Sequence, residues 1–560
     1  MSDLHTAEDA EYEERLQQRL QLLIDRFKQG KIKIAEGLKV ADSLQAVRTH
    51  PDGSINLDTV DGLVRAMALG VEQIDLREET KSIASLAEIQ HGYFGYINRH
   101  FDHLYREMVK HRVTPHDIAL QISQNTDMVS EISSSISEFI SMISDFWLDT
   151  ADIAQLHIED MTDSMKGVYG GDLFPDANHN IGSNCGIYTD TIILPDPFLR
   201  SKAAFEKWSP EDRTYYFVKH GINILQYREL ACAEISPPIV VVVPDYTLVE
   251  KGELEFIAKN GFEDTLIHCE KIFGRKFESF EELVHYSEKL DTESKFLESI
   301  SDGSRVLFET NWGGTPSKQL KEALKDKTVK FFGSENPGSL LVSYSHGRLC
   351  ACNELLIKSS RLGGTPIIEV PTSWNYLSWK IEYDAERRGQ ELNLTNLHVL
   401  KGLRGLAKQE MEWLGNVPVD ALIELRKTGA LDEIRQTLSG GILELVQASP
   451  DNYFRTTDQV FDNIHSAFDN HKKNVDLLKS KKWKFAGNDI GSWFVVGSLA
   501  VTAAATGTAT WGIAAVLADQ MLDAPKLKSI PGSIKSLAKS SKELNRSPVG
   551  ILYNCKSKKG

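Results

Sequence analysis

The chain has 560 residues, of which 41% are hydrophobic and 25% charged, and its formal net charge is −16 at pH 7. These proportions are ordinary for globular proteins, and the length predicts two to four domains. The acidic balance argues against a protein that holds nucleic acid across its whole surface, so nucleic acid is not expected as the main partner. Six cysteines without framework spacing and an acidic N-terminal stretch indicate a reducing cytoplasm.

Residues 1–170 carry the spacing of amphipathic helices. From Glu8 to Lys28 apolar residues recur at three and four positions, which predicts one apolar helix face. Thr114-Pro115 predicts a capped helix start, because proline suits the first helical position. A long helix is predicted from Asp127 to Lys166, with a break near Asp149. We expect a helical, coiled-coil-like interaction region that binds a partner protein or self-associates.

Residues 185–385 have the pattern of an α/β domain with a mixed or parallel sheet. The segments 187–194 and 238–244 are predicted strands, and a helix is predicted between them at 208–232, an order that indicates a βαβ unit. The second strand is almost continuously apolar, as strands buried on both faces are. A helical insertion is expected at about 250–302. Further strands are predicted at Arg305–Phe308, Val329–Phe332, Leu340–Tyr344 and Pro366–Val370, with a helix at Gly347–Leu362.

Residues 386–560 again have helical periodicity, and they contain an Ala/Gly-rich apolar segment. This segment, 490–518, has no charged residue, whereas lysines lie on both sides of it. The tail, 520–560, is basic; it is expected to be solvated or to touch an anionic surface. The periodic segments that predict helices are Leu403–Leu414, Asp420–Thr428, Leu431–Leu438 and Tyr453–Leu478.

The uncharged run 490–518 is long enough to cross a bilayer, which takes about 20 apolar residues. Small residues dominate it and Thr506-Gly507-Thr508 suggests a break, so a buried helical hairpin is the favoured interpretation. A single spanning helix and a segment that inserts only in one state are the alternatives. Under either alternative Trp493, Phe494 and Trp511 would meet the membrane.

Carboxylates mark the predicted strands of the α/β domain. Asp190 lies in the first of the two main strands, and Asp196 and Asp245 follow the two as Pro-Asp pairs. Ligands of open parallel sheets bind beyond the carboxyl ends of the strands, so the three could converge and hold Mg²⁺ or act as acid and base. The simpler explanation is that proline and aspartate favour turns. Glu309 and Glu369, at the ends of two further predicted strands, would join the same cluster.

A glycine turn before a predicted helix start is a second candidate ligand site. The backbone amides of Gly313 and Gly314 could hold an anion with help from Lys318, although a turn followed by a helix cap explains the same residues. An aromatic stripe farther along indicates a core or an interface in preference to a platform that stacks bases. The stripe consists of Trp374, Tyr376, Trp379 and Tyr383.

No metal site and no bound cofactor are expected, apart from Mg²⁺ under the carboxylate interpretation. His346, Cys350 and Cys352 have zinc-ligand chemistry but lack a fourth ligand nearby. The polar loop 170–184 alternates acidic and amide residues but lacks the closing glutamate of a calcium loop. The sequence also contains no GxxxxGK[ST] phosphate loop and no GxGxxG.

The function expected from these features is that of a cytoplasmic sensor or effector, with catalysis not expected. It would act through protein contacts and conditional membrane engagement by residues 490–518, in a role such as host defence. The alternative is a Mg²⁺-dependent hydrolase of nucleotides or nucleic acid that uses Asp190, Asp196 and Asp245. A second alternative is a scaffold that oligomerises through its N-terminal helices.

Overall fold

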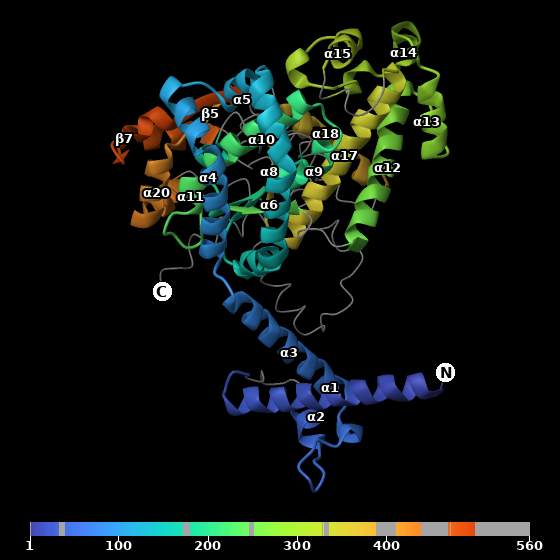
Figure 1. The fold of residues 1–560 in the computed structure, drawn as a ribbon, viewed down its shortest axis with the longest axis vertical. Coiled ribbons are helices and arrows are strands. Elements are labelled where there is room, and N and C mark those ends of the chain that lie inside the picture. The colour runs from blue at the N-terminus through green and yellow to red at the C-terminus, as the bar shows by residue number, and fades with distance from the viewer. Residues whose placement is uncertain are drawn as a thin grey trace. The chain divides into compact units, whose positions relative to one another are not determined.

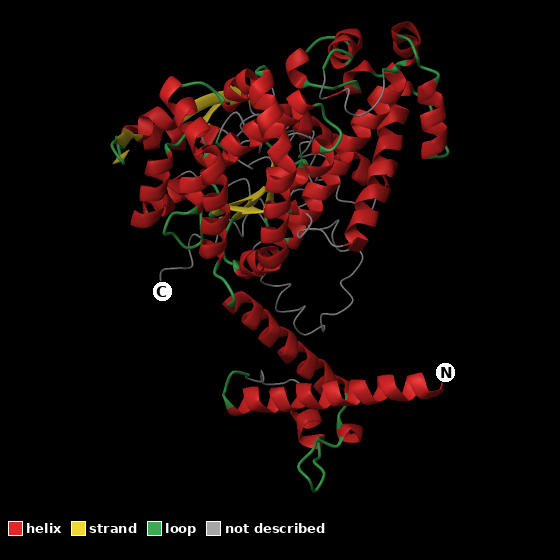
Figure 2. Cartoon of the chain, in the orientation of Figure 1, coloured by secondary structure: helices red, strands yellow, loops and turns green. Residues whose placement is uncertain are grey.

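The protein combines helical regions with a central α/β region, as the sequence predicts (Figures 1 and 2). Helices dominate, and a four-stranded parallel sheet lies in the middle of the chain. The chain forms two compact units, which divide after Leu86. The computed structural model describes residues 2–32, 40–171, 180–245, 251–326, 329, 335–387, 410–437, 469–470 and 472–498.

The first unit is built on α1 (Ser2–Lys28) and α3 (Gly62–Ser82), with the shorter α2 (Val40–Ala46) and η1 (Leu57–Thr59) between them. Leucines of α1 and small apolar residues of α3 form its buried cluster. Two arginines of α1 form ion pairs with acidic residues of α3, at 2.6 Å and 2.8 Å. The helical face predicted for Glu8–Lys28 is confirmed, because it carries the buried residues Leu16, Leu20 and Leu23.

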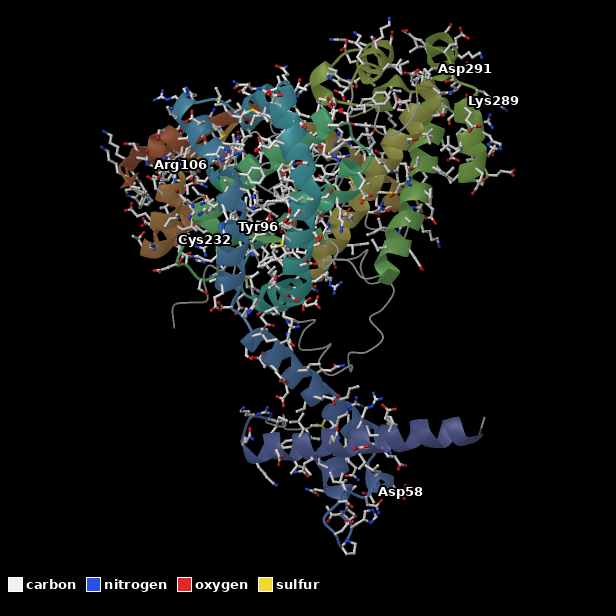
Figure 3. All side chains as sticks on the ribbon, viewed as in Figure 1. Asp58, Tyr96, Arg106, Cys232, Lys289 and Asp291 are labelled. Carbon is white, nitrogen blue, oxygen red and sulfur yellow. The ribbon has the colours of Figure 1, made fainter. Side chains whose placement is uncertain are left out.

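The second unit opens with α4 (Leu86–His111), α5 (Pro115–Ser123) and α6 (Thr126–Asp160). Thr114 caps α5 as predicted. The break predicted near Asp149 is wrong, since α6 is continuous and keeps burying residues at helical spacing through Trp147, Ala151 and Ile158. Aromatic rings fill the space between these helices. Tyr96, labelled on α4 in Figure 3, lies 5.0 Å from Phe139 of α6 between ring centroids.

The sheet consists of β1 (Lys166–Tyr169), β2 (Thr191–Pro195), β3 (Val240–Val243) and β4 (Thr365–Ile367). Its strand order is β3-β2-β1-β4, and every neighbouring pair is parallel. The chain therefore moves outward from β1 to β3 and then returns to the other side of β1. In open parallel sheets, ligands commonly bind at the carboxyl edge near such a reversal, which in this sheet lies between β1 and β4.

Helices connect the strands and cover the sheet. α17 packs along β1 and β4, and Leu355 comes so close to β1 that a Cβ on Gly170 or Gly171 would lie 3.2 Å or 3.0 Å from it. At the edge of the sheet away from β4, α6 and α11 contact β3. Every residue of β1 and β3 is buried. The connecting helices are α7 (Ile181–Cys185), α8 (Pro197–Arg200), α9 (Lys202–Phe205), α10 (Pro210–Leu225), α11 (Arg228–Ala231), α12 (Lys251–Phe273), α13 (Phe280–Glu288), α14 (Glu293–Ser299), α15 (Pro316–Ala323) and α17 (Pro337–Arg361).

Two predicted strands are wrong. Arg305–Phe308 begins at the end of the 3-10 helix η3 (Gly303–Arg305) and continues without strand pairing. Leu340–Tyr344 belongs to α17, which is capped by Asn336 and buries residues on several sides, so its sequence lacks a polar face. The strand predicted at Val329–Phe332 lies outside the described residues except for Val329, and β1 was not predicted at all.

After β4 come α18 (Pro371–Arg387), β5 (Glu410–Leu414), α20 (Val419–Thr428), β6 (Lys484–Phe485), β7 (Asn488–Asp489), η7 (Ile490–Trp493) and β8 (Phe494–Ser498). β5 and β8 pair antiparallel, with Leu414 opposite Phe494. The predicted helix Leu403–Leu414 is therefore wrong at its described end. The predicted helical hairpin is wrong for the described part of this run. Ile490–Trp493 is a single 3-10 turn, and Phe494–Ser498 is extended because it pairs with β5.

Residues 499–518, with Trp511, and the basic tail lie outside the described residues. Within the part of the chain that the structure describes, no helix is both long and apolar enough to cross a membrane.

Candidate ligand-binding site

The carboxyl ends of the parallel strands bring polar side chains to one edge of the sheet. β1 ends at Tyr169, β2 at Pro195 and β3 at Val243, and Glu369 follows β4 by two residues. Open parallel sheets bind ligands at this edge, where the strand order reverses. A cavity lies at the same edge, over the ends of β1 and β2.

The walls of this cavity come from β1, β2, α8, α10 and the turn after α10. Two tyrosine rings and four apolar side chains make most of the lining, and four polar side chains are set among them. The apolar and aromatic members are Tyr169, Leu194, Pro195, Pro197, Ile224 and Tyr227. The polar members are Arg200, Ser201, His220 and Asn223.

The helix α10 presents one face to the cavity. Ser209 caps its N-terminus and Pro210 takes the first position, which sets where the helix begins. His220, Asn223 and Ile224 follow at spacings of three and four, which places them on the same face. His220 is 4% exposed and Asn223 is 7% exposed, so both polar side chains are buried at the cavity wall.

Ser201 and His220 form a hydrogen bond, with 2.9 Å between the serine Oγ and the histidine Nε2. Burial lowers the pKa of His220 to about 3, with a smaller contribution from the neighbouring Lys219. The imidazole is therefore neutral at pH 7, and one ring nitrogen is a donor while the other is an acceptor. No hydrogen bond from a described residue reaches its Nδ1 atom.

A compact ion network lies beside the cavity. Arg200 forms ion pairs with Asp245 and with Glu354, the latter at 3.1 Å, and Lys358 contacts the same two carboxylates. Burial alone would raise the pKa of Asp245, but the charges of Lys358 and Arg200 lower it below its usual value. Two cations and two anions are present, so the network adds no net charge to the cavity wall.

Glu369 connects the end of β4 to the end of β1. The Tyr169 hydroxyl donates a hydrogen bond of 2.9 Å to Glu369 Oε2. Burial raises the pKa of the Tyr227 hydroxyl, and the charge of Glu369 raises it further. The carboxylate therefore lies close to both tyrosines of the cavity wall, at the point where the strand order reverses.

Asp196 is fully buried after β2, where it acts as a structural cap. Its Oδ1 accepts from the backbone amides of Phe198 and Leu199, at 2.8 Å and 3.0 Å, and its Oδ2 accepts from Trp147 Nε1 at 2.7 Å. Burial raises the pKa of Asp196 to about 6. Both carboxylate oxygens of Asp196 accept hydrogen bonds from protein donors, and the two backbone donors lie at the start of α8. Asp196 is not part of the cavity wall.

Asp190 lies at the opposite edge of the sheet, directly before β2. Arg435 contacts its Oδ1 at 2.6 Å, and the amide of Met165 donates to its Oδ2 at 2.8 Å. Arg426 donates to the Asp190 carbonyl at 2.7 Å. Of the three aspartates singled out from sequence, the structure thus brings Asp196 and Asp245 to the carboxyl edge and separates Asp190 from them.

The glycine turn lies elsewhere. Gly313 and Gly314 follow η4 (Thr310–Trp312) with φ of +54° and +81°, and α15 begins shortly after them, with Lys318 in its first turn. These three residues are not part of the cavity wall. Glu309 accepts from Thr372 and contacts Arg348, which places it in a separate buried network.

The aromatic stripe of α18 belongs to the core, as expected. Tyr376 and Tyr383 are fully buried, and Trp374 and Trp379 nearly so. Trp493 is likewise buried in protein, and Lys479 lies over the ring of Phe494 at 5.1 Å.

Metal-ligating side chains do not gather in the described ranges: no group of three or more His, Cys, Asp or Glu there is arranged to hold an ion. His346 and Cys350 lie one turn apart on α17, with 3.6 Å between Nε2 and Sγ. Burial raises the pKa of Cys350 to about 12 and lowers that of His346, so both are neutral at pH 7.

Sequence reasoning missed Ser201, His220 and Asn223, which come together from two elements. A usable signal was present, because His220, Asn223, Ile224 and Tyr227 share one face of a predicted helix and mix polar with apolar residues. We compared the chain with models of protein families, with curated proteins and with solved structures, and none of the three comparisons gives a match.

Proposed function

We propose that the protein is a ligand-responsive sensor or effector, whose second unit binds a small molecule in the cavity at the carboxyl edge of the sheet. The observation that carries this proposal is the pair His220 and Asn223, two buried polar side chains that line a cavity over the carboxyl ends of β1 and β2. Burying a polar group costs free energy unless it forms hydrogen bonds. A few polar side chains set in a mostly apolar pocket are typical of sites that bind small molecules, because the ligand can complete those hydrogen bonds.

The effector side of the proposal rests on the first unit. Its helix α3 exposes Ile74 at 57% and Leu76 at 61%, and Ile83, directly after the helix, is 72% exposed. Large apolar side chains that are exposed near one another on a helix favour contact with a partner protein or with a second copy of the chain. Engagement of a membrane by residues 490–518 stays part of the proposal, although Phe494–Ser498 is extended and pairs with β5.

The magnesium-hydrolase alternative has less support. Asp245 is committed to Arg200 and Lys358, and a metal ion there would have to displace two cations. Asp196 holds the start of α8, and Asp190 lies at the other edge of the sheet. A cluster of carboxylates open to Mg²⁺ would need a different arrangement of these side chains.

The test is a thermal-shift screen of the full-length protein against nucleosides, nucleotides, amino acids, sugars and sugar phosphates. A ligand present at 100 times its Kd stabilises the folded state by about 2.7 kcal/mol, which moves Tm by several degrees. We expect at least one compound to raise Tm in the wild type and to lose the effect in Ile224→Trp, which fills the cavity.

The matched control for the screen is Leu148→Trp, at a position on α6 that is 73% exposed and not part of the cavity wall. It should keep the full shift. A screen in which no compound raises Tm, or in which the shift persists in Ile224→Trp, would overturn the proposal.

A further inference from the structure

We infer that the part of the ligand held in the cavity is an uncharged planar heterocycle, the base of a nucleoside. This inference rests on the proposed function and names the class of ligand for the same site. It follows from three features of the cavity: the ring-bearing side chains in its walls, the hydrogen-bonding atoms that the walls present, and their net charge.

The walls suit a flat ring. Tyr169 and Tyr227 contribute aromatic rings, and Pro195 and Pro197 contribute rigid pyrrolidine rings around the same space. Bases bind proteins largely by stacking on aromatic side chains such as these tyrosines. A branched aliphatic ligand or an extended chain would make less use of rigid, flat walls.

The polar atoms suit the edge of a heterocycle. Asn223 Oδ1 accepts from Gln226 Nε2 at 3.3 Å, and its Nδ2 donors have no hydrogen-bond partner among the described residues. The amide therefore offers both a donor and a second acceptor lone pair, a combination that pairs with a ring nitrogen and an adjacent amino or carbonyl group. His220 adds a ring nitrogen, Nδ1, on the same face of α10.

The electrostatics exclude a charged group from the cavity. Among the described residues that line the cavity, Arg200 is the only charged one, and it already forms ion pairs with Asp245 and Glu354. The His220 imidazole is uncharged, so a buried phosphate or carboxylate would lack a counter-charge. An unpaired buried ion costs several kcal/mol, on the order of a thousandfold in affinity, so a neutral ring is favoured.

We assign the sugar of the ligand to Glu369, which lies next to the cavity wall and is not part of it. Its carboxylate lies at the end of β4 beside Tyr169 and close to Tyr227, and it is partly exposed. A carboxylate accepts hydrogen bonds from the vicinal hydroxyls of a ribose and repels a phosphate. The site is thus built for a nucleoside in preference to its 5′-phosphate.

The experiment is isothermal titration of the full-length protein with adenosine, guanosine, cytidine and uridine, and with the four matching monophosphates. Ribose and inorganic phosphate are titrated as fragments. We expect one or more nucleosides to bind, and the matching monophosphate to bind at least tenfold more weakly. Asn223→Asp, which replaces the amide donors by a carboxylate, should weaken nucleoside binding at least tenfold.

Asn260→Asp on α12 is the matched control, since the same chemical change there lies outside the cavity wall, and it should leave Kd unchanged. Circular dichroism and Tm establish that each variant is folded. If Asn223→Asp fails to fold, Ser201→Ala replaces it; removing the hydroxyl that positions His220 should weaken nucleoside binding several-fold.

The outcomes separate the two proposals. If sugars or amino acids stabilise the protein through the cavity and no nucleoside binds, the inference is wrong and the proposed function stands. If monophosphates bind as tightly as nucleosides, the site accepts a charged ligand and the inference is wrong, while the proposed function stands. If no compound of any class binds, both the inference and the proposed function are overturned.

Discussion

Gln90 of α4 closes the outer edge of the sheet by pairing with Val242 of β3. Its Nε2 donates to the Val242 carbonyl and its Oε1 accepts from the Val242 amide, both at 2.9 Å. β3 is an edge strand, and Gln90 is fully buried. The side-chain amide thus takes the place of a fifth strand and satisfies main-chain groups that would otherwise be buried without partners.

We predict that Gln90→Leu lowers the free energy of unfolding by about 2–4 kcal/mol, because it leaves one buried donor and one buried acceptor on Val242 unsatisfied. Urea denaturation measures this loss. Gln121→Leu, the same change at an exposed position of α5, is the control and should alter stability by less than about 0.5 kcal/mol. Equal effects in the two variants would contradict the role given to Gln90.

Because of Asp196, the folded state should become less stable as the pH rises. Burial raises its pKa from 3.8 to about 6 in the folded state, so the folded protein binds the proton more tightly than the unfolded chain does. This contribution is complete below pH 3.8 and is lost as the pH rises through about 6; its full size is about 3 kcal/mol.

The measurement for Asp196 is urea denaturation of wild type and Asp196→Asn at several pH values from 4 to 7.5. The variant loses the acceptor for Trp147, so it should be less stable throughout, and its deficit should shrink as pH rises. A deficit that grows with pH would mean that the three donors hold the carboxylate ionised, and the raised pKa would be wrong.

Asp190 should show the opposite pH dependence. Although burial alone would raise its pKa, Arg435 and Arg426 lower it below 3.8, so its stabilisation is present above that value and is lost as pH falls through the folded pKa. Asp190→Asn leaves two buried guanidinium groups without their carboxylate, and we expect a loss on the order of 3 kcal/mol at pH 7.

The control for Asp190 is Asp163→Asn, a change at an exposed position shortly before β1. Denaturation at pH 7 and pH 3.5 should give a deficit for Asp190→Asn that shrinks at the lower pH, and little effect of Asp163→Asn at either. A loss that is independent of pH would show that shape, not charge, holds α20 and residues 430–437 against the sheet.

The effect of replacing Trp493 shows whether this residue belongs to the protein core or anchors the chain in a membrane. It is 1% exposed and its ring lies 6.0 Å from that of Phe485. Trp493→Ala should therefore lower the free energy of unfolding by about 3–5 kcal/mol in solution, as truncation of a buried tryptophan does. Val496→Ala, at a position 64% exposed, should have little effect.

Fractionation of expressing cells, followed by alkaline carbonate washing of the membranes, complements the stability measurement for Trp493. If Trp493→Ala abolishes retention in the washed pellet and leaves stability in solution intact, Trp493 is an anchor and its assignment to the core is wrong.

Much of the architecture could be predicted from local patterns. The helical spacing of Leu16, Leu20 and Leu23, the Thr114-Pro115 start and the apolar run of β3 each identify an element, because propensity and periodicity act over a few residues. Prediction failed where burial removes the pattern. α17 is buried on several sides, so its first turns have the apolar character of a strand.

The sequence predicted that a site would lie at the carboxyl edge of the sheet, but it did not predict which residues line the cavity there. Glu369 was singled out as a strand-end carboxylate, and it does lie at the carboxyl edge beside Tyr169. Ser201 and His220 are 19 residues apart on different elements and meet only because α10 folds back over the end of β2. No spacing along the chain encodes such a contact.

The amino-acid sequence by itself determined the class of the fold, the helical N-terminal region and the buried strands β2 and β3, since these depend on neighbours within a few residues. The equally buried β1 was not predicted. Only the tertiary structure decided which polar residues share a site. Asp196 and Asp190 look like catalytic carboxylates along the chain, yet one caps α8 and the other neutralises Arg435. A carboxylate's role depends on the donors that surround it, and those donors come from distant segments of the chain.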